Sequence, residues 1–254
     1  MNPRAALLLS FFAILFLTNC KSSYHAGTTF NTTGSDPQAI AIADKVMQAM
    51  GGYRNWSNTR YIGWDFFTVR SLVWDKKLHR VRIESPKKNY VIVLNLNDMS
   101  GKVMWEGKEV THPDTLKKYL NLGRDIWIND SYWLFMPFKL KDSGVTLKYK
   151  AEEVMMGNVY TDKLQLTFDK VGVTPENMYN VWVDKNTHLV VKWEYYSKPT
   201  REHAEITNTW GNYKKYGKIL LSDDRGERGK LRNIFVTKNY DEAAFNKLAL
   251  SKLE

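Results

Sequence analysis

The stretch 179–197, YNVWVDKNTHLVVKWEYYS, decides the fold class of this chain. Apolar and aromatic residues dominate 178–183 and 189–196, and the polar tetrapeptide 184–187, DKNT, separates them. Two such runs around a polar turn indicate an antiparallel β-hairpin. Because successive side chains of a strand point to opposite faces, one set on the second strand is predicted to face the interior. This set consists of Leu189, Val191, Trp193 and Tyr195.

Similar strand patterns continue on both sides of the hairpin. Short alternating runs separated by polar turns fill 59–105, and further runs occupy 145–168 and 204–236. About eleven strands of this kind predict a mostly β, α+β fold, in which a strongly curved antiparallel sheet forms an incomplete β-barrel. By the same alternation, three residues of the first strands are predicted to face the interior with this set. These three are Ile62, Trp64 and Phe66. Together the seven are predicted to form the wall of a ligand cavity, and plain core packing is the alternative.

One helix is predicted before the first strand. Asp36 is suited to cap it, Pro37 to occupy its first position, and the pair Gly51 and Gly52 to end it. Adaptable methionines on its apolar face could touch a lipid chain, although packing of this face against the sheet is the alternative. The face consists of Ile40, Ala43, Met47 and Met50.

A strongly apolar insert, HPDTLKKYLNLGRDIWINDSYWLFMPFKL, lies at 112–140 between the two strand series. Its pattern predicts two short helices, 113–120 and 124–135. Exposed, its aromatic residues would form a larger apolar patch than monomeric proteins usually tolerate, so the insert must lie against the sheet. With Gly123 and Gly144 as flexible ends, it is predicted to be a lid over the barrel mouth; a fixed core element is the alternative. The lid residues are Trp127, Trp133, Phe135 and Phe138.

The N-terminus has the features of an export signal. Arg4 precedes an apolar run from Ala5 to Leu17, which is too short to span a bilayer. The tetrapeptide 17–20, LTNC, resembles a bacterial lipobox, and this resemblance makes Cys20 the lipidated N-terminus of the mature protein. A soluble secreted protein with a free thiol is the alternative. Because Cys20 is the only cysteine, the chain has no internal disulfide.

These features divide the chain into three parts. Residues 1–19 are predicted to be the signal peptide, and 20–35, rich in Ser, Thr, Gly and Asn, to be a lipidated flexible tether. Residues 36–254 are then one globular domain, because they contain neither a second linker nor an internal repeat. Acyl chains such as palmitate on Cys20 would hold this domain at a membrane without inserting it.

Three segments of the chain resemble one known family. They are the hairpin 179–197, the segment 210–226, WGNYKKYGKILLSDDRG, and the segment 233–245, NIFVTKNYDEAAF. In these patterns, over about 36–245, the chain is similar to the outer-membrane lipoprotein carriers LolA and LolB. The resemblance implies an incomplete barrel whose apolar concavity takes acyl chains under covering helices. It further implies a monomer that faces the periplasm, and the anchor at Cys20 resembles the membrane-bound LolB.

Catalytic and metal-binding motifs are not apparent in the sequence. It contains no G-x-S-x-G, H-E-x-x-H, Walker or dinucleotide motif, and the five histidines lack metal-ligand spacing. His203 and Glu205 could share a strand face as an acid/base pair or half of a zinc site, with an exposed polar pair as the alternative. We therefore expect no enzyme, no cofactor and no metal.

The formal net charge of +10 is scattered along the chain and forms no dense stripe. Such a distribution favours anionic lipid head groups or envelope polymers over nucleic acid as partners. Two functions remain open. The first is a non-enzymatic carrier or acceptor of an acyl chain, lipid or lipoprotein, anchored to the bacterial cell membrane, with the outer membrane preferred. The second is a structural or regulatory envelope lipoprotein that has a filled barrel and acts through surface contacts.

Overall fold

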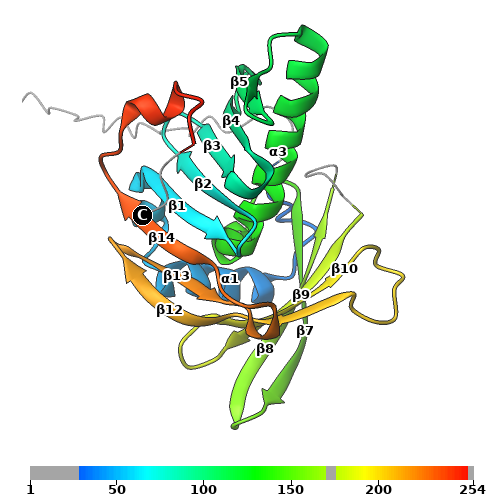
Figure 1. The fold of residues 1–254 in the computed structure, drawn as a ribbon. Coiled ribbons are helices and arrows are strands. Elements are labelled where there is room, and N and C mark those ends of the chain that lie inside the picture. Colours follow the sequence, from blue (N-terminus) through cyan, green and yellow to red (C-terminus); the bar gives the residue numbers. More distant parts are fainter. Residues whose placement is uncertain (1–28, 170–175, 251–254) are drawn as a thin grey trace, which may run out of the picture.

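The computed structural model describes residues 29–169 and 176–250. The predicted signal peptide, Cys20 and the first part of the tether therefore lie outside the described residues. The chain forms two large antiparallel sheets and one small one, with a long central helix against the first sheet (Figure 1). None of the three sheets closes on itself.

The first sheet is a meander of short hairpins that recruits one strand from near the C-terminus. Its order is β14-β1-β2-β3-β4-β5-β6, and each neighbouring pair is antiparallel. Its strands are β1 (Tyr61–Phe66), β2 (Arg70–Asp75), β3 (Arg80–Ser85), β4 (Tyr90–Asn95), β5 (Gly101–Trp105), β6 (Lys108–Glu109) and β14 (Arg232–Thr237).

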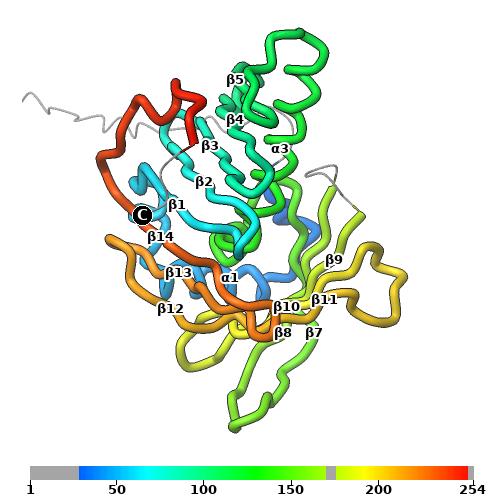
Figure 2. The backbone as a smooth tube through the Cα atoms, viewed as in Figure 1, coloured from blue at the N-terminus to red at the C-terminus, as the bar shows by residue number. Residues whose placement is uncertain are grey.

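The second sheet contains the predicted hairpin of residues 179–197. Its order is β11-β10-β9-β8-β7, and β12 pairs with β13 in a separate two-stranded sheet. The strands are β7 (Val145–Met155), β8 (Val159–Phe168), β9 (Met178–Asp184), β10 (Val190–Tyr196), β11 (Ile206–Thr209), β12 (Gly211–Tyr216) and β13 (Ile219–Asp224). Backbone bonds join the small sheet to its neighbours: Trp210 donates to the Val191 carbonyl at 2.8 Å, and Leu231 to that of Asp223 at 2.8 Å. The chain thus passes from the second sheet through the small sheet to β14 (Figure 2).

The prediction of a mostly β, α+β fold with antiparallel sheets and a central helix is confirmed. The sequence patterns indicated about eleven strands in one curved sheet, whereas the described residues form fourteen strands in three sheets. One of the additional strands is β12, which follows directly after the strand predicted between 204 and 210 and pairs with β13 alone. In the predicted hairpin, the Asp184 carboxylate accepts bonds from the amides of Asn186 and Thr187 at 2.7 and 2.8 Å, which closes the turn.

The insert forms one helix rather than the two that were predicted. This helix, α3 (Pro113–Phe135), is continuous through Gly123 and is followed by the short 3-10 helix η2 (Met136–Lys139). Gly123 does not interrupt α3 but lets it approach β4, since an added Cβ would lie 2.7 Å from Cγ2 of Ile92. Close packing, and not a hinge, therefore explains this glycine.

Helix α1 (Pro37–Ala49) is present as predicted and is followed by the short helix α2 (Tyr53–Asn58). Asp36 precedes α1 but makes no side-chain cap. Its carboxylate instead accepts bonds from the Lys148 ammonium at 2.9 Å and the Tyr149 amide at 3.0 Å, both on β7. The predicted apolar face is shifted by about one position, because Ala39, Ile42, Ala43, Val46 and Met50 are the buried residues, whereas Ile40 and Met47 are only partly buried.

The last residues of the predicted tether form hydrogen bonds with β7. The amide of Asn31 donates to the Val145 carbonyl at 3.1 Å, and the amide of Leu147 donates to the Ser35 hydroxyl at 2.9 Å. Residues 31 and 35, just before the predicted domain start at Asp36, are therefore bonded to β7. Their polar composition did not reveal this, because their partners lie far away in the sequence.

Candidate ligand pocket

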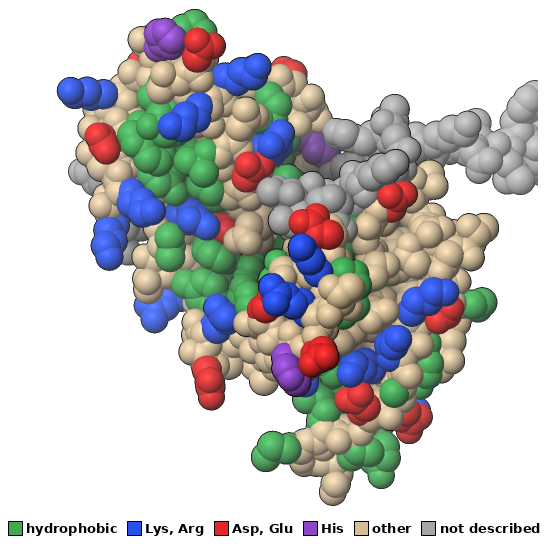
Figure 3. Space-filling view, turned by 90° about the vertical axis from the view of Figure 1, so that its right-hand side faces the viewer, with side chains coloured by type: hydrophobic (Ala, Val, Ile, Leu, Met, Phe, Trp, Pro, Cys, Tyr) green, Lys and Arg blue, Asp and Glu red, His purple; other side chains and the backbone are tan. Residues whose placement is uncertain are grey.

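A pocket lies between the C-terminal half of α3 and the second sheet. Its volume is about 570 Å³, and α3, the η2–β7 connection and strands β8 to β11 contribute to its lining. Figure 3 shows apolar side chains gathered on the side of the molecule where α3 lies. The volume falls in the range of about 300–1,000 Å³ that is usual for sites of small ligands.

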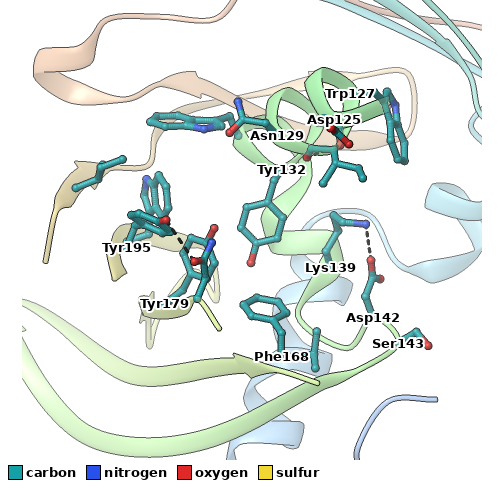
Figure 4. A pocket seen from close by; sticks show the side chains of 17 residues that line it. Asp125, Trp127, Asn129, Tyr132, Lys139, Asp142, Ser143, Phe168, Tyr179 and Tyr195 are labelled. Atoms are coloured by element: carbon teal, nitrogen blue, oxygen red, sulfur yellow. Dashed lines mark hydrogen bonds and ion pairs between the residues drawn. The ribbon is translucent and has the colours of Figure 1, made fainter. Parts of the chain in front are cut away.

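Aromatic rings form most of the wall. Tyr132 of α3 lies 5.0 Å from Tyr179 of β9, measured between ring centroids. Tyr179 in turn lies 5.4 Å from both Trp193 and Tyr195 of β10, and 5.6 Å from Phe168 of β8. Figure 4 shows Tyr132 pointing into the pocket between these rings and the pair Lys139 and Asp142. Such a surface favours an apolar or planar ligand over a highly charged one.

A few polar groups lie among the rings. The Lys139 ammonium forms an ion pair with Asp142, and the Tyr195 hydroxyl donates to Asn177 at 3.3 Å. The Tyr132 hydroxyl is buried and has no hydrogen-bond partner among the described residues. Burial raises the pKa of Tyr132 well above its ordinary value, so the hydroxyl keeps its proton at physiological pH.

Two interactions fix the helix that forms one wall. Asp130 on α3 is fully buried and accepts two bonds from Arg70 on β2, at 2.5 and 2.7 Å. Burial raises the pKa of the Asp130 carboxyl, and the Arg70 charge opposes that shift. Near the end of the helix, the carbonyl of Trp133 accepts two bonds from the buried guanidinium of Arg225. The position of α3 is thus set by polar contacts on two sides.

The seven predicted wall residues separate into three groups. Trp193 and Tyr195 line the pocket. The three from the first sheet do not line it; they are buried under α3, where Trp64 packs edge-on against Phe135 at 5.3 Å and Phe66 against Trp133 at 6.1 Å. Ile62 is fully buried in the same core.

Leu189 and Val191 do not follow the predicted alternation. The β9–β10 register shifts between Val190 and Lys192, so that Val191 sits in an irregularity of the ladder. As a result Val190 is the fully buried residue, whereas Val191 is only partly buried and Leu189 packs against the core from outside the strand. A bulge adds one residue to one strand and reverses the alternation beyond it.

Of the four predicted lid residues, two line the pocket and two are buried in the core. Trp127 and Trp133 line the pocket. Phe135 and Phe138 are buried on the other side of the helical segment, at 5.4 and 4.2 Å from the ring of Trp56. The insert therefore fills a core with one face and lines a pocket with the other.

Sequence reasoning missed several lining residues, among them Tyr132, Phe168 and Tyr179. One signal could have found Tyr179, because it stands directly opposite Tyr195 in the antiparallel hairpin. Phe168 and Tyr132 lie on other elements, and only the packing of α3 against the second sheet brings them together.

The acid/base pair considered at His203 and Glu205 does not form. The Glu205 carboxylate is engaged by the amide and hydroxyl of Ser197, at 2.7 and 2.6 Å, and by Arg201 at 3.2 Å. Within 29–169 and 176–250, no group of three or more His, Cys, Asp or Glu residues is placed to hold a metal. Over the same ranges, no helix combines the length and apolar character needed to span a membrane.

Comparison with known proteins gives distant structural likenesses. A DUF1329 family protein from Desulfovibrio piger aligns with a TM-score of 0.48 and 16% identity, over 83% of this chain and 98% of that one. A putative outer membrane lipoprotein-sorting protein domain from Vibrio parahaemolyticus aligns with a TM-score of 0.42 and 13% identity, over 82% of this chain and 96% of that one. A LolA superfamily protein from Nitrosomonas europaea aligns with a TM-score of 0.37 and 9% identity, over 81% of this chain and 96% of that one. No protein-family model matches the sequence, and no curated protein matches it significantly.

Proposed function

We propose that this chain is a non-enzymatic envelope lipoprotein that binds an acyl chain, lipid or lipoprotein in the pocket between α3 and the second sheet. The observation that carries the proposal is the pocket itself, about 570 Å³ in volume and walled by aromatic rings from α3, β8, β9 and β10. A ring-lined pocket offers an apolar chain burial without requiring charged partners.

In this proposal α3 is a fixed wall and not a moving lid. For α3 to move, its buried contacts with Arg70 and Arg225 would have to break. Breaking either contact would leave buried polar groups without hydrogen-bond partners. The ligand enters through the open side of the pocket. The concave side of the first sheet, which α3 covers, is occupied by core side chains and takes no ligand.

The proposal extends to the position of the protein in the cell. Lipidation of Cys20 would anchor it to the bacterial membrane, with the outer membrane preferred, and leave the monomeric domain facing the periplasm.

A pocket-filling variant tests the proposal. Ile206 on β11 lines the pocket, whereas its neighbour Thr207 is exposed. We expect the full-length protein to take up the apolar dye 1-N-phenylnaphthylamine saturably, Ile206→Trp to weaken this uptake at least tenfold, and Thr207→Trp to leave it unchanged. Absence of saturable uptake in the wild-type protein, together with no lipid co-purifying in mass spectrometry, would favour the structural alternative.

A further inference from the structure

The Tyr132 hydroxyl is an unused hydrogen-bonding group on a side chain that lines the pocket. It is buried and has no partner among the described residues, although it belongs to a side chain that lines the cavity. Another pocket-lining tyrosine, Tyr195, differs in this respect, because its hydroxyl donates to Asn177. A buried polar group without a partner costs about 1–3 kcal/mol, so an apolar side chain of the same shape would be better for stability alone.

The charges of the lining restrict what can meet this hydroxyl. Three lining residues carry charge: the carboxylates of Asp125 and Asp142 and the ammonium of Lys139. Lys139 is paired with Asp142, and Asp125 with Arg124 at 2.9 Å. The pocket therefore holds no cation without a carboxylate partner among these residues. A ligand carboxylate would therefore give up its water without finding an unpaired cation among these residues, which makes an anionic head group unfavourable.

We propose that the ligand is a neutral acyl ester or amide, whose carbonyl oxygen accepts a hydrogen bond from Tyr132. This inference rests on the proposed function and adds the chemical class of the ligand. The carbonyl lies among the rings while the hydrocarbon chain covers Phe168, Tyr179 and Trp193. A free fatty acid and a plain hydrocarbon both bind less well, because the first carries a charge and the second leaves the hydroxyl unpaired.

The test compares three probes of similar length by their displacement of 1-N-phenylnaphthylamine from the full-length protein at pH 8: methyl decanoate, decanoate and undecane. The wild-type protein should bind methyl decanoate about five- to tenfold more tightly than either of the others. Tyr132→Phe should abolish the preference for methyl decanoate over undecane while leaving the affinity for undecane unchanged or higher. Tyr195→Phe is the matched control, and it should keep the preference.

Tyr132→Phe also has a readout that does not involve ligand. Because the hydroxyl has no partner, its removal should leave the free energy of unfolding in urea unchanged or higher, whereas Tyr195→Phe should lower it slightly. An ester preference that is equal in wild type and Tyr132→Phe, or tighter binding of decanoate, would overturn the inference while the proposed function stands. Failure of the wild-type protein to take up the dye would overturn both.

Discussion

The guanidinium of Arg225 donates two hydrogen bonds to the backbone carbonyl of Trp133, at 3.1 Å from Nε and 2.5 Å from Nη2. Its other bonds go to Ser222 and the Asp224 carbonyl, and its Cζ atom lies 3.5 Å from the ring centroid of Trp210. Among the described ion pairs none involves this fully buried side chain. Arg225 therefore ties the last turn of α3, and with it the pocket wall, to β13 through carbonyl oxygens and an aromatic face.

Replacing Arg225 should destabilise the protein markedly. Arg225→Met keeps much of the side-chain volume but leaves the Trp133 carbonyl without these donors. We expect the free energy of unfolding in urea to fall by about 2–4 kcal/mol. Arg228→Met is the control, since Arg228 is exposed and lies 5.9 Å from the Trp133 ring; its effect should stay within about 0.5 kcal/mol. Equal effects of the two variants would contradict the assigned role.

Hydrogen exchange should show α3 as a fixed element. Because Arg70 and Arg225 hold the helix on two sides, the amides of 124–135 should be protected to the level of global unfolding both with and without methyl decanoate. The β7–β8 hairpin tip, where Met156 is 99% exposed, provides a fast-exchanging reference within the same sample. Ligand-dependent exchange confined to 113–144 would restore the lid that the sequence predicted.

Gly123→Ala should destabilise the protein although alanine is the better helix former. An isolated helix would gain about 1 kcal/mol from this change, but here the new methyl group meets Ile92 at 2.7 Å. We expect a net loss of about 1–3 kcal/mol in urea unfolding. In an Ile92→Ala background the clash is absent, so the same substitution should become neutral or stabilising. A destabilisation of equal size in both backgrounds would show that close packing is not the reason for this glycine.

Lys76 should give the protein a stability that rises with pH. Burial lowers the pKa of Lys76 to about 8, with a further contribution from the charge of Lys139, and the ammonium lies 4.8 Å from the Trp56 ring centroid. Between pH 8 and the ordinary lysine pKa near 10.4, the unfolded chain holds a proton that the native state lacks. Stability attributable to Lys76 is therefore lowest and constant below pH 8 and rises above it.

The measurement compares variants across that pH range. Lys76→Met should be more stable than wild type at pH 7, by about 1–2 kcal/mol after solvent screening, and the difference should shrink between pH 8 and 10.4. Lys77 is an exposed neighbour, so the stability of Lys77→Met should change with pH in the same way as that of the wild type. A wild-type-minus-variant difference that is constant with pH would refute the role of Lys76.

Cys20→Ser tests the proposed anchor. The cysteine follows the apolar run at lipobox spacing, so the variant should lose lipidation and leave the membrane fraction after a carbonate wash, without a change in the unfolding of the domain. Wild-type protein expressed in the same bacterial cells is the comparison. Retention of Cys20→Ser in the washed membranes would exclude the lipid anchor.

The local elements of this protein could be predicted from its sequence. The hairpin of 179–197 has its turn at 184–187 because Asp184 bonds to the amides of the next residues, and this interaction needs no distant partner. The same holds for α1, which begins at Pro37 and ends before Gly51 and Gly52. Alternation and helix signals act over a few residues, so short segments specify them.

The site depends on contacts that no local pattern contains. Straight alternation placed Val191 with Trp193, but the shift in register at Val191 brings Val190 to the interior instead. Gly123 has the appearance of a helix break in the sequence, yet it is the residue that allows α3 to pack on Ile92.

The tertiary structure alone decided which aromatic residues fill the core and which form the pocket. Trp64 and Trp193 are equally plausible wall residues by their strand patterns, but α3 covers the first and leaves the second beside a cavity. The reason is physical: alternation tells which side of a strand is apolar, whereas the space next to that side is set by a helix that Arg70 and Arg225 hold from two different sheets.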